Sequence, residues 1–234
     1  MKIQAVKAQR LYLLVADQLR ELIRQGTPAP GERLPSERDL AEQFGVGRPT
    51  IREAMIALEI AGLVQIRSGS GVYVTDSNQP LIVNTRPADH LDQGPGPFEI
   101  LEARLLFEGE ACALAAERCT PAQLAELERT LEEMQQENLR ETVSEQADEQ
   151  FHCLIAEASS NSAIAATVNW LWRLRKDSGI NTHFHRRLRE EGLRPVINDH
   201  RAILDALREG DPDIARSAMR NHLQRVIDLL MTLR

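Results

Sequence analysis

The feature that most constrains the fold is the stretch 33–74, RLPSERDLAEQFGVGRPTIREAMIALEIAGLVQIRSGSGVYV. Apolar residues recur at helical spacing on both sides of Gly45-Val46-Gly47, which predicts two helices joined by a tight turn, since glycine adopts the positive backbone angles of a sharp reversal. Pro49 suits the start of the second helix, where its missing N–H is not required. Alternating residues then predict two short strands, Leu63–Arg67 and Val72–Thr75, around a tip of serine and glycine.

The second of these helices has one apolar face and a cationic N-terminal end. Its inward positions are Ile51, Ala54, Met55 and Leu58. Arg48, Thr50 and Arg52 are expected to face outward, and Arg38 adds a further cation from the helix before the turn. The N-terminal end of a major-groove helix is where base edges and phosphates are contacted, and a guanidinium suits both. The alternative is an ordinary helical hairpin with scattered surface arginines.

Several motifs in this part of the chain resemble, in order and spacing, the winged-helix domain of GntR-type bacterial transcription regulators: Gly31–Ala41, Gly45-Val46, Arg48, Arg52-Glu53-Ala54, Leu58-Glu59 and Gly62-Leu63. The match spans roughly residues 10–75 and includes an amphipathic helix expected over 8–25. The resemblance implies that operator DNA is contacted by Arg38, Arg48, Thr50, Arg52, Ser68 and Gly69. Many relatives carry Ser or Thr where Gly47 and Pro49 stand, so a phosphate contact from a hydroxyl is missing at both positions.

The charge of the chain is unevenly divided. The net charge is −7, but residues 1–78 hold ten basic and nine acidic residues, whereas the remainder holds 18 basic and 26 acidic. The acidity therefore belongs to the second part, and local rather than total charge determines attraction to phosphate.

The three cysteines and the hydropathy pattern indicate the compartment. Cys112, Cys119 and Cys153 are odd in number and lack C-x-x-C spacing, which favours reduced thiols in the cytoplasm. No apolar signal core and no run of about eighteen apolar residues occurs, so neither secretion nor a membrane-spanning helix is expected.

Beyond Thr75 the sequence predicts a linker and then only helices. Residues 77–96, which end in Gly94-Pro95-Gly96, carry no hydrophobic period and are expected to join a domain of residues 1–76 to one of residues 97–234. Thr120-Pro121 and Asp211-Pro212 are capped helix starts. The predicted helices are 97–118, 121–139, 143–159, 162–176, 178–190, 194–209 and 212–233. Seven helices with short loops indicate a bundle.

Four residues of the second domain form a candidate metal site. Asp148 and His152 are four residues apart on one helix, so both point the same way, and His200 and His222 lie on two later helices. One carboxylate and three imidazoles suit Zn²⁺, Mn²⁺, Ni²⁺ or Fe²⁺, if the three helices converge. The alternative is a set of unrelated surface or hydrogen-bonded histidines.

Motifs in this region resemble the FCD effector domain: Phe98–Glu108 with Arg104, Asp148-x-x-Phe151-His152, Asn161, Asp199-His200 and Met219-x-x-His222-Leu223. The resemblance implies that Asp148, His152, His200 and His222 bind a divalent metal, with zinc favoured. It also implies that Arg104 and Asn161 bind an effector; the alternative for Arg104 is a structural ion pair. The start Gly96-Pro97-Phe98-Glu99 is similar to that of hexuronate-catabolism repressors, which implies a sugar-acid effector.

Together these observations predict a mainly α protein with an N-terminal winged helix-turn-helix followed by an all-α FCD-type bundle. The expected function is that of a cytoplasmic, homodimeric transcription regulator that binds a palindromic operator, senses a small carboxylate such as a hexuronate through a metal-containing domain, and acts as a repressor. It is not expected to be an enzyme, since no HExxH or comparable motif occurs. Two alternatives stay open: a metal-dependent enzyme acting on a small carboxylate, and a regulator whose metal is purely structural.

Overall fold

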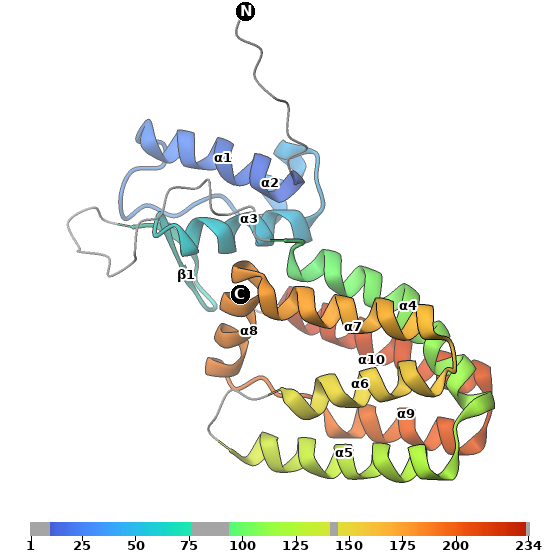
Figure 1. Cartoon of the computed structure of the whole chain (residues 1–234). Coiled ribbons are helices and arrows are strands. Elements are labelled where there is room, and N and C mark those ends of the chain that lie inside the picture. Colours follow the sequence, from blue (N-terminus) through green and yellow to red (C-terminus); the bar gives the residue numbers. More distant parts are fainter. Residues whose placement is uncertain (1–9, 76–93, 141–144, 233–234) are drawn as a thin grey trace, which may run out of the picture. The chain divides into compact units, whose positions relative to one another are not determined.

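The computed structural model describes residues 10–75, 94–140 and 145–232 (Figure 1). The chain divides into two compact units, the first comprising Met1–Phe98 with Met231–Arg234 and the second Glu99–Leu230. Most of the predicted linker, 77–96, and the first residues of the predicted helix 8–25 lie outside the described residues.

The first unit has the predicted order of helices and strands. Its elements are α1 (Leu11–Arg24), α2 (Glu37–Phe44), α3 (Arg48–Ile60), β1 (Val64–Arg67) and β2 (Gly71–Val74). The strands pair antiparallel, with Val64 opposite Val74 and Arg67 opposite Gly71. The winged helix-turn-helix predicted from the sequence is therefore confirmed.

The turn between α2 and α3 differs in one detail from the prediction. Ser36 caps α2 by accepting from the Asp39 N–H at 3.2 Å, and Gly45 ends the helix in the left-handed conformation with φ 65°. Gly47 does not share this conformation, because it is the extended N-cap of α3 with φ −69°. Only the first of the two glycines supplies the positive angle of the reversal.

The predicted apolar face of α3 forms the core of this unit. Ile51, Ala54, Met55 and Leu58 are all buried, and α3 packs against α1, which contributes Val15 and Leu19. This packing places the N-terminal end of α3 at a fixed position beside the α2–α3 turn. The orientation of the helix is thus determined by the same residues that the helical period identified.

The β-hairpin is supported from one side by the chain before α2. Arg33 forms an isolated bridge with Tyr73, and the Leu34 N–H donates to the Val72 carbonyl at 2.8 Å. A Cβ atom on Gly71 would lie 2.5 Å from Nε of Arg33, so no larger residue fits there without movement of that side chain. This glycine allows the arginine to lie against the wing.

The described residues of the second unit form helices that are joined by short loops. They are α4 (Pro97–Arg118), α5 (Pro121–Leu139), α6 (Gln146–Ala158), α7 (Ser162–Asp177), α8 (Gly179–Glu190), α9 (Ile197–Glu209) and α10 (Pro212–Thr232). All seven helices match predicted ones, with ends shifted by at most three residues. In Figure 1 the long helices lie side by side, and α5 packs against both α6 and α9.

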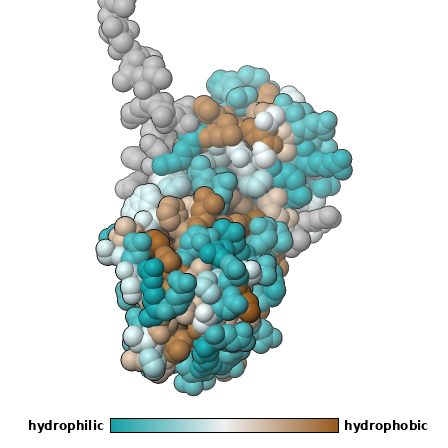
Figure 2. Space-filling view, turned by 90° about the vertical axis from the view of Figure 1, so that its right-hand side faces the viewer, coloured by the Kyte–Doolittle hydropathy of each residue, from teal (hydrophilic) through white to brown (hydrophobic). Residues whose placement is uncertain are grey.

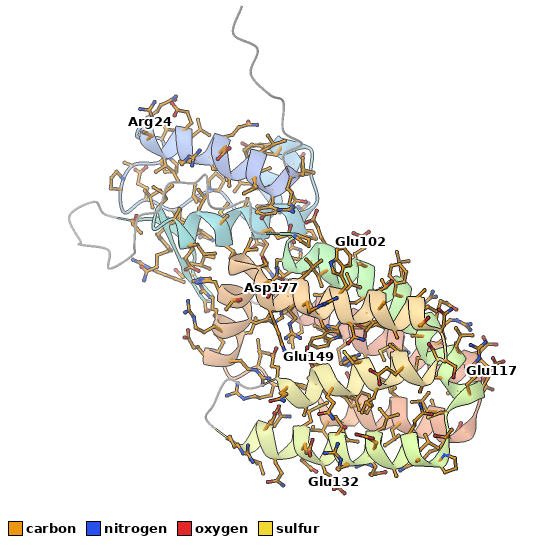
Figure 3. The ribbon with its side chains drawn as sticks, viewed as in Figure 1. Arg24, Glu102, Glu117, Glu132, Glu149 and Asp177 are labelled. Carbon is orange, nitrogen blue, oxygen red and sulfur yellow. The ribbon has the colours of Figure 1, made fainter. Side chains whose placement is uncertain are left out.

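The core of the bundle is formed by apolar side chains from six of its helices: Cys112, Leu127, Leu131, Phe151, Ile155, Ile203, Leu204, Trp172, Met219 and Leu223. Thr120 begins α5 with a reciprocal cap, in which its side chain and that of Gln123 each bond the other's backbone. Charged residues such as Glu117 and Glu132 are exposed on the outside of the bundle (Figure 3). The helices are therefore amphipathic about one common interior, as their period predicts.

The exposed surface is mixed in character. On the face shown in Figure 2, hydrophobic residues gather in several patches that hydrophilic residues separate. None of the helices in the described ranges combines the length and apolarity needed to cross a bilayer. The three cysteines are free thiols, with Cys112 buried.

Candidate functional site

Three histidines from three helices meet in the interior of the second unit. His152 lies on α6, His200 on α9 and His222 on α10, and one nitrogen of each lies within 4.8 Å of the others. All three are buried, with exposed fractions of 1%, 0% and 5%. The convergence of helices on which the sequence prediction depended is therefore present.

Asp148 completes this set, one turn before His152 on α6. Its Oδ1 atom lies 3.0 Å from Nε2 of His200 and 3.7 Å from Nε2 of His152. Burial alone would raise the pKa of the Asp148 carboxyl, but the hydrogen bond from His200 and the nearby positive charges hold it below its usual range. The carboxylate is thus ionised, as a metal ligand must be.

Each imidazole has an outer partner that orients the ring. Nδ1 of His200 lies 2.9 Å from the Val196 carbonyl, to which its N–H donates. Nδ1 of His152 lies 2.6 Å from Oε2 of Glu108, and Nδ1 of His222 lies 3.5 Å from Oδ2 of Asp199. A carbonyl or carboxylate beside Nδ1 favours a proton on that nitrogen, and Nε2 of His200 faces Asp148 from the other side of its ring. Sequence reasoning assigned no role to Glu108.

The chemistry of these residues fits a divalent cation. Nε2 of His152 is buried and has no hydrogen-bond partner among the described residues, and such an atom is costly unless a ligand satisfies it. Burial lowers the pKa of His152 and lowers that of His222 to about 4, which keeps both rings neutral near pH 7. Neutral imidazoles and one carboxylate are the donors that zinc and its neighbours in the first transition series prefer.

Arg104 lies beside the histidines but is paired. Its Nε and Nη2 lie 2.6 and 3.3 Å from the two oxygens of Glu108, and both side chains are buried. Burial raises the pKa of Glu108, but the charge of Arg104 together with the contacts that Arg104 and His152 make to the carboxylate lowers it to about 2. The ion pair that the sequence analysis weighed for Arg104 is therefore present, and its contact with an effector stays a prediction.

A second group of charges lies next to Arg104, and sequence reasoning missed it. Arg175 of α7 and Arg189 of α8 are both paired with Glu145, which precedes α6. The guanidinium carbons of Arg104 and Arg175 lie 4.2 and 4.6 Å from the ring centroid of Trp172, which is buried. No motif links these residues in sequence, and only the fold brings them together.

Asn161 lies at an exposed position where α7 begins. Its Oδ1 atom accepts from the backbone N–H groups of Ala163 and Ile164 at 3.1 and 3.3 Å, which makes it the N-cap of that helix. This geometry accounts for an asparagine here by helix capping. The contact with an effector stays a prediction for this residue also.

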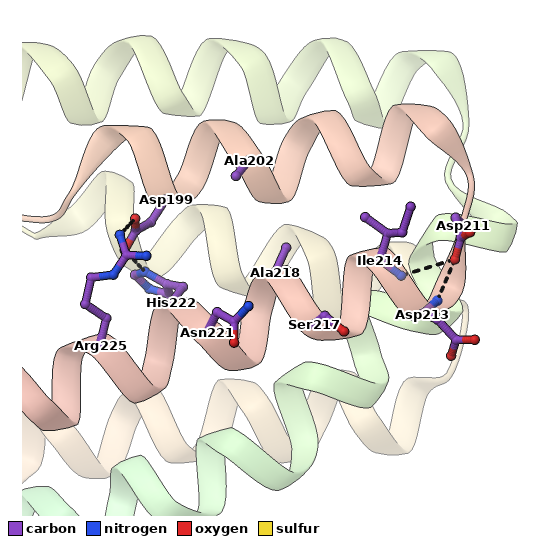
Figure 4. A pocket seen from close by; sticks show the side chains of 10 residues that line it. All are labelled: Asp199, Ala202, Asp211, Asp213, Ile214, Ser217, Ala218, Asn221, His222 and Arg225. Atoms are coloured by element: carbon purple, nitrogen blue, oxygen red, sulfur yellow. Dashed lines mark hydrogen bonds and ion pairs between the residues drawn. The ribbon is translucent and has the colours of Figure 1, made fainter.

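A groove of about 550 Å³ runs along α9 and α10 and reaches one of the histidines (Figure 4). Its lining residues include Ile214, Ser217, Asn221 and His222. At this end of the groove Asp199 is paired with Arg225 beside His222, and all three residues line it.

The predicted DNA-contacting residues of the first unit differ in exposure. Arg38 and Arg48 are exposed, Thr50 is half-buried, and Ser68 and Gly69 are exposed at the tip of the wing, where Gly69 has φ 74°. These five occupy positions that a nucleic acid can approach, and their contacts with DNA stay predictions.

The prediction that Arg52 faces outward is wrong. Arg52 is only 7% exposed, and its Nε and Nη2 each lie 2.8 Å from an oxygen of Glu37, in the first turn of α2. Arg48 approaches the same carboxylate at 3.5 Å. Helical period alone does not reveal that an acidic side chain of α2 covers this position of α3. The bidentate pair joins α2 to α3, the two helices of the helix-turn-helix.

Comparisons with known proteins agree with both halves of this structure. A family model described as "Bacterial regulatory proteins, gntR family" matches residues 11–74, and one described as "FCD domain" matches residues 99–225. The Uxu operon transcriptional regulator of Escherichia coli K12 is 36% identical over 97% of this chain and 89% of that protein. The Exu regulon transcriptional regulator of the same strain is 35% identical over 94% and 84%. The transcriptional repressor NanR of Enterobacter sp. 638 is 34% identical over 93% and 84%.

Proposed function

The chain belongs to the gntR family of bacterial regulatory proteins and carries an FCD domain, and from this premise we propose that it represses genes of sugar-acid catabolism until a hexuronate binds its second unit. It is a DNA-binding transcription regulator and not an enzyme. Its relatives named for the Uxu operon and the Exu regulon support a hexuronate as the effector. We further propose that it acts in the cytoplasm as a homodimer on a palindromic operator, because one recognition helix covers only a half-site.

In the first unit, α3 is the helix proposed to enter the major groove. Its N-cap is Gly47, which offers no side chain to the first N–H groups of the helix, and Arg48 is exposed in the first turn. The exposed Ser68 and Gly69 place a small wing tip where a sugar-phosphate backbone can come close. Arg52 acts on DNA binding through its pair with Glu37, which positions α3.

In the second unit, Asp148, His152, His200 and His222 are proposed to hold a divalent cation, with zinc favoured. Held there, the cation supplies a Lewis-acid centre for oxygen atoms of the effector. Glu108 and the Val196 carbonyl keep His152 and His200 in the tautomers that ligation needs. The planar guanidinium group of Arg104 contributes a positive charge beside this centre. The single observation that carries this proposal is the convergence of three buried histidines and one carboxylate beside buried guanidinium groups.

The size of the response to the effector is limited by how differently the effector binds the two states of the protein. A ligand shifts the protein between a DNA-binding and a non-binding state only by its difference in affinity for the two. For a hundredfold release from DNA, the effector must bind the released state about a hundredfold more tightly.

A thermal-shift screen of the metal-loaded protein against small carboxylic acids tests this function. A hexuronate is expected to raise the melting temperature, since a ligand that binds only the folded state stabilises it. Metal analysis of protein purified without added ions is the companion measurement. An empty site together with undiminished operator binding and no response to any sugar acid would contradict the sensor role, and a metal that is present without such a response would indicate a structural one.

A further inference from the structure

We propose that Arg175 and Arg189 form a carboxylate-binding subsite beside the histidines, and that Glu145 fills this subsite until the carboxylate of an acidic ligand displaces it. This inference rests on the proposed function in taking that ligand to be the effector. It assigns the acidic end of the effector to Arg175 and Arg189, and it leaves Arg104, which Glu108 already holds, for the hydroxyl groups.

The contacts of Glu145 are those of a bound carboxylate. Its Oε1 atom lies 3.0 Å from Nε of Arg189 on α8, and its Oε2 atom pairs with Nη2 of Arg175 on α7. Two guanidinium groups from two helices thus share one carboxylate. The contact with Arg189 is an ion pair and the one with Arg175 is also a hydrogen bond, and guanidinium groups pair in this way with a planar carboxylate from the protein or from a ligand.

Glu145 is more easily released than its partners. Its side chain is 23% exposed, whereas those of Arg175 and Arg189 are 10% and 3% exposed. It stands at the N-cap position of α6 but makes no capping hydrogen bond through its side chain, so leaving the subsite does not uncap that helix. The arginines, by contrast, cannot reach water easily and need an anion in place of Glu145.

Arg175 also contacts His185, and this histidine adds no positive charge to the subsite. Nε of Arg175 donates to Nε2 of His185 at 2.9 Å. Burial, followed by the positive charges of Arg175 and Arg104, lowers the pKa of His185 well below its ordinary value, so this ring is a neutral acceptor. A carboxylate entering the subsite therefore meets two cations and no competing imidazolium.

Asp148 lies between the subsite and the histidines and contacts both. Nη1 of Arg175 lies 3.7 Å from Oδ2 of Asp148, and the other oxygen of Asp148 lies 3.0 Å from Nε2 of His200. A ligand that is acidic at one end and carries oxygen atoms along its length can therefore reach both places at once. This describes a short polyhydroxy carboxylate better than a simple fatty or aromatic acid.

Trp172 provides an independent sign that a polar ligand belongs here. Its ring lies against the guanidinium groups of both Arg104 and Arg175, and its centroid is 5.5 Å from that of His152. The side chain is 2% exposed, and its Nε1 has no hydrogen-bond partner among the described residues. A buried indole N–H normally finds an acceptor, and a hydroxyl of the ligand would supply one.

The experiment compares the full-length zinc-loaded protein with its Glu145→Gln variant by calorimetric titration. D-glucuronate is the first probe, and malonate, which carries carboxylates without hydroxyl groups, is the second. Glu149→Gln is the matched control, because Glu149 lies one turn further along α6 and pairs with Lys176 (Figure 3). Glu145→Asp, which keeps the charge but shortens its reach, serves if Glu145→Gln does not fold.

Removing the internal competitor should strengthen binding. Glu145→Gln, or Glu145→Asp in its place, is expected to bind D-glucuronate about five- to tenfold more tightly than the wild type, the scale of a coupling between competing groups. Glu149→Gln should match the wild type, and the zinc content should be equal in all proteins. Unchanged or weaker binding by a folded, zinc-loaded Glu145 variant would overturn the subsite.

Malonate tests the subsite independently of whether the effector is a hexuronate. If neither wild type nor variant binds D-glucuronate, the hexuronate assignment fails, and the subsite is decided by malonate alone. Tighter malonate binding by the Glu145 variant would then support the subsite. Equal binding by the two proteins, or binding by neither, would overturn it.

Discussion

Oε2 of Glu108 lies 2.6 Å from Nδ1 of His152, so a buried carboxylate fixes the ring of a proposed metal ligand. The same carboxylate receives two hydrogen bonds from Arg104. Glu108 therefore connects the guanidinium beside the proposed effector site to the imidazole at the proposed metal. The side chains of Arg104 and His152 are therefore both oriented by Glu108 and not only by the helices that carry them.

Glu108→Gln should weaken metal binding without removing a proposed ligand. Loss of an outer carboxylate that orients a histidine typically lowers metal affinity about 10- to 100-fold. Competition with a chromophoric chelator measures this change directly. Glu110→Gln is the control, since Glu110 lies two residues away but is half exposed and pairs with Arg216 and Arg220. Equal metal affinity in the two variants would exclude Glu108 as a positioning residue.

Arg48→Ala and Arg52→Ala should separate DNA contact from support of the fold. Arg52 is buried against Glu37, so its removal should destabilise the protein by about 1–3 kcal/mol, the cost of leaving a charged group without its partner. Arg48 is exposed, and its removal should instead reduce the salt dependence of operator binding by about one ion. Urea unfolding and binding titrations at several salt concentrations distinguish the two. An Arg52→Ala protein of wild-type stability that no longer binds the operator would reverse the assignment.

The metal-free protein should lose stability as the pH falls from 6.5 to about 4. Burial lowers the pKa of His222 to about 4 in the folded state, so between these pH values the unfolded chain binds the additional proton. Stability therefore rises with pH across this window, by about 3 kcal/mol for this group alone. Urea unfolding of metal-free protein at pH 5 and pH 7 measures the slope. A His222→Asn variant should show a flatter dependence, and an identical slope in that variant would show that His222 is not the group responsible.

Removal of the metal should lower the melting temperature of the wild type but not of a variant in which a proposed ligand is missing. At a free metal concentration a hundred times Kd, binding adds about 2.7 kcal/mol to the free energy of unfolding. Calorimetry before and after dialysis against a chelator tests this. His200→Ala should melt at the same temperature with and without metal, and a chelator effect that persists in it would place the metal elsewhere.

Much of the fold is predictable because its signals are local. Thr120 and Pro121 mark the start of α5 within two residues, and the apolar period of α3 identifies the side chains that the structure buries. Asp148 and His152 were predictable as a pair because four residues on one helix give one direction. The place of His200 and His222 beside them came from a family resemblance, and the structure confirms that the three histidines meet.

What could not be predicted depends on contacts between elements. The burial of Arg52 requires the position of Glu37 on the preceding helix, and the pairing of Arg175 with Glu145 joins residues 30 positions apart. Arginine and glutamate are common on helix surfaces, so their types alone do not distinguish a buried pair from a solvated one. Glu108 illustrates this, since its role appears only when His152 is placed beside it.

The most direct measurement is a fluorescence-anisotropy titration of the zinc-loaded protein with double-stranded DNA from its own promoter neighbourhood, with and without D-glucuronate or D-galacturonate. We expect salt-dependent binding that one of these acids weakens, and no such weakening in metal-free protein. Operator binding that neither acid changes in zinc-loaded protein would contradict the proposed sensing of a hexuronate.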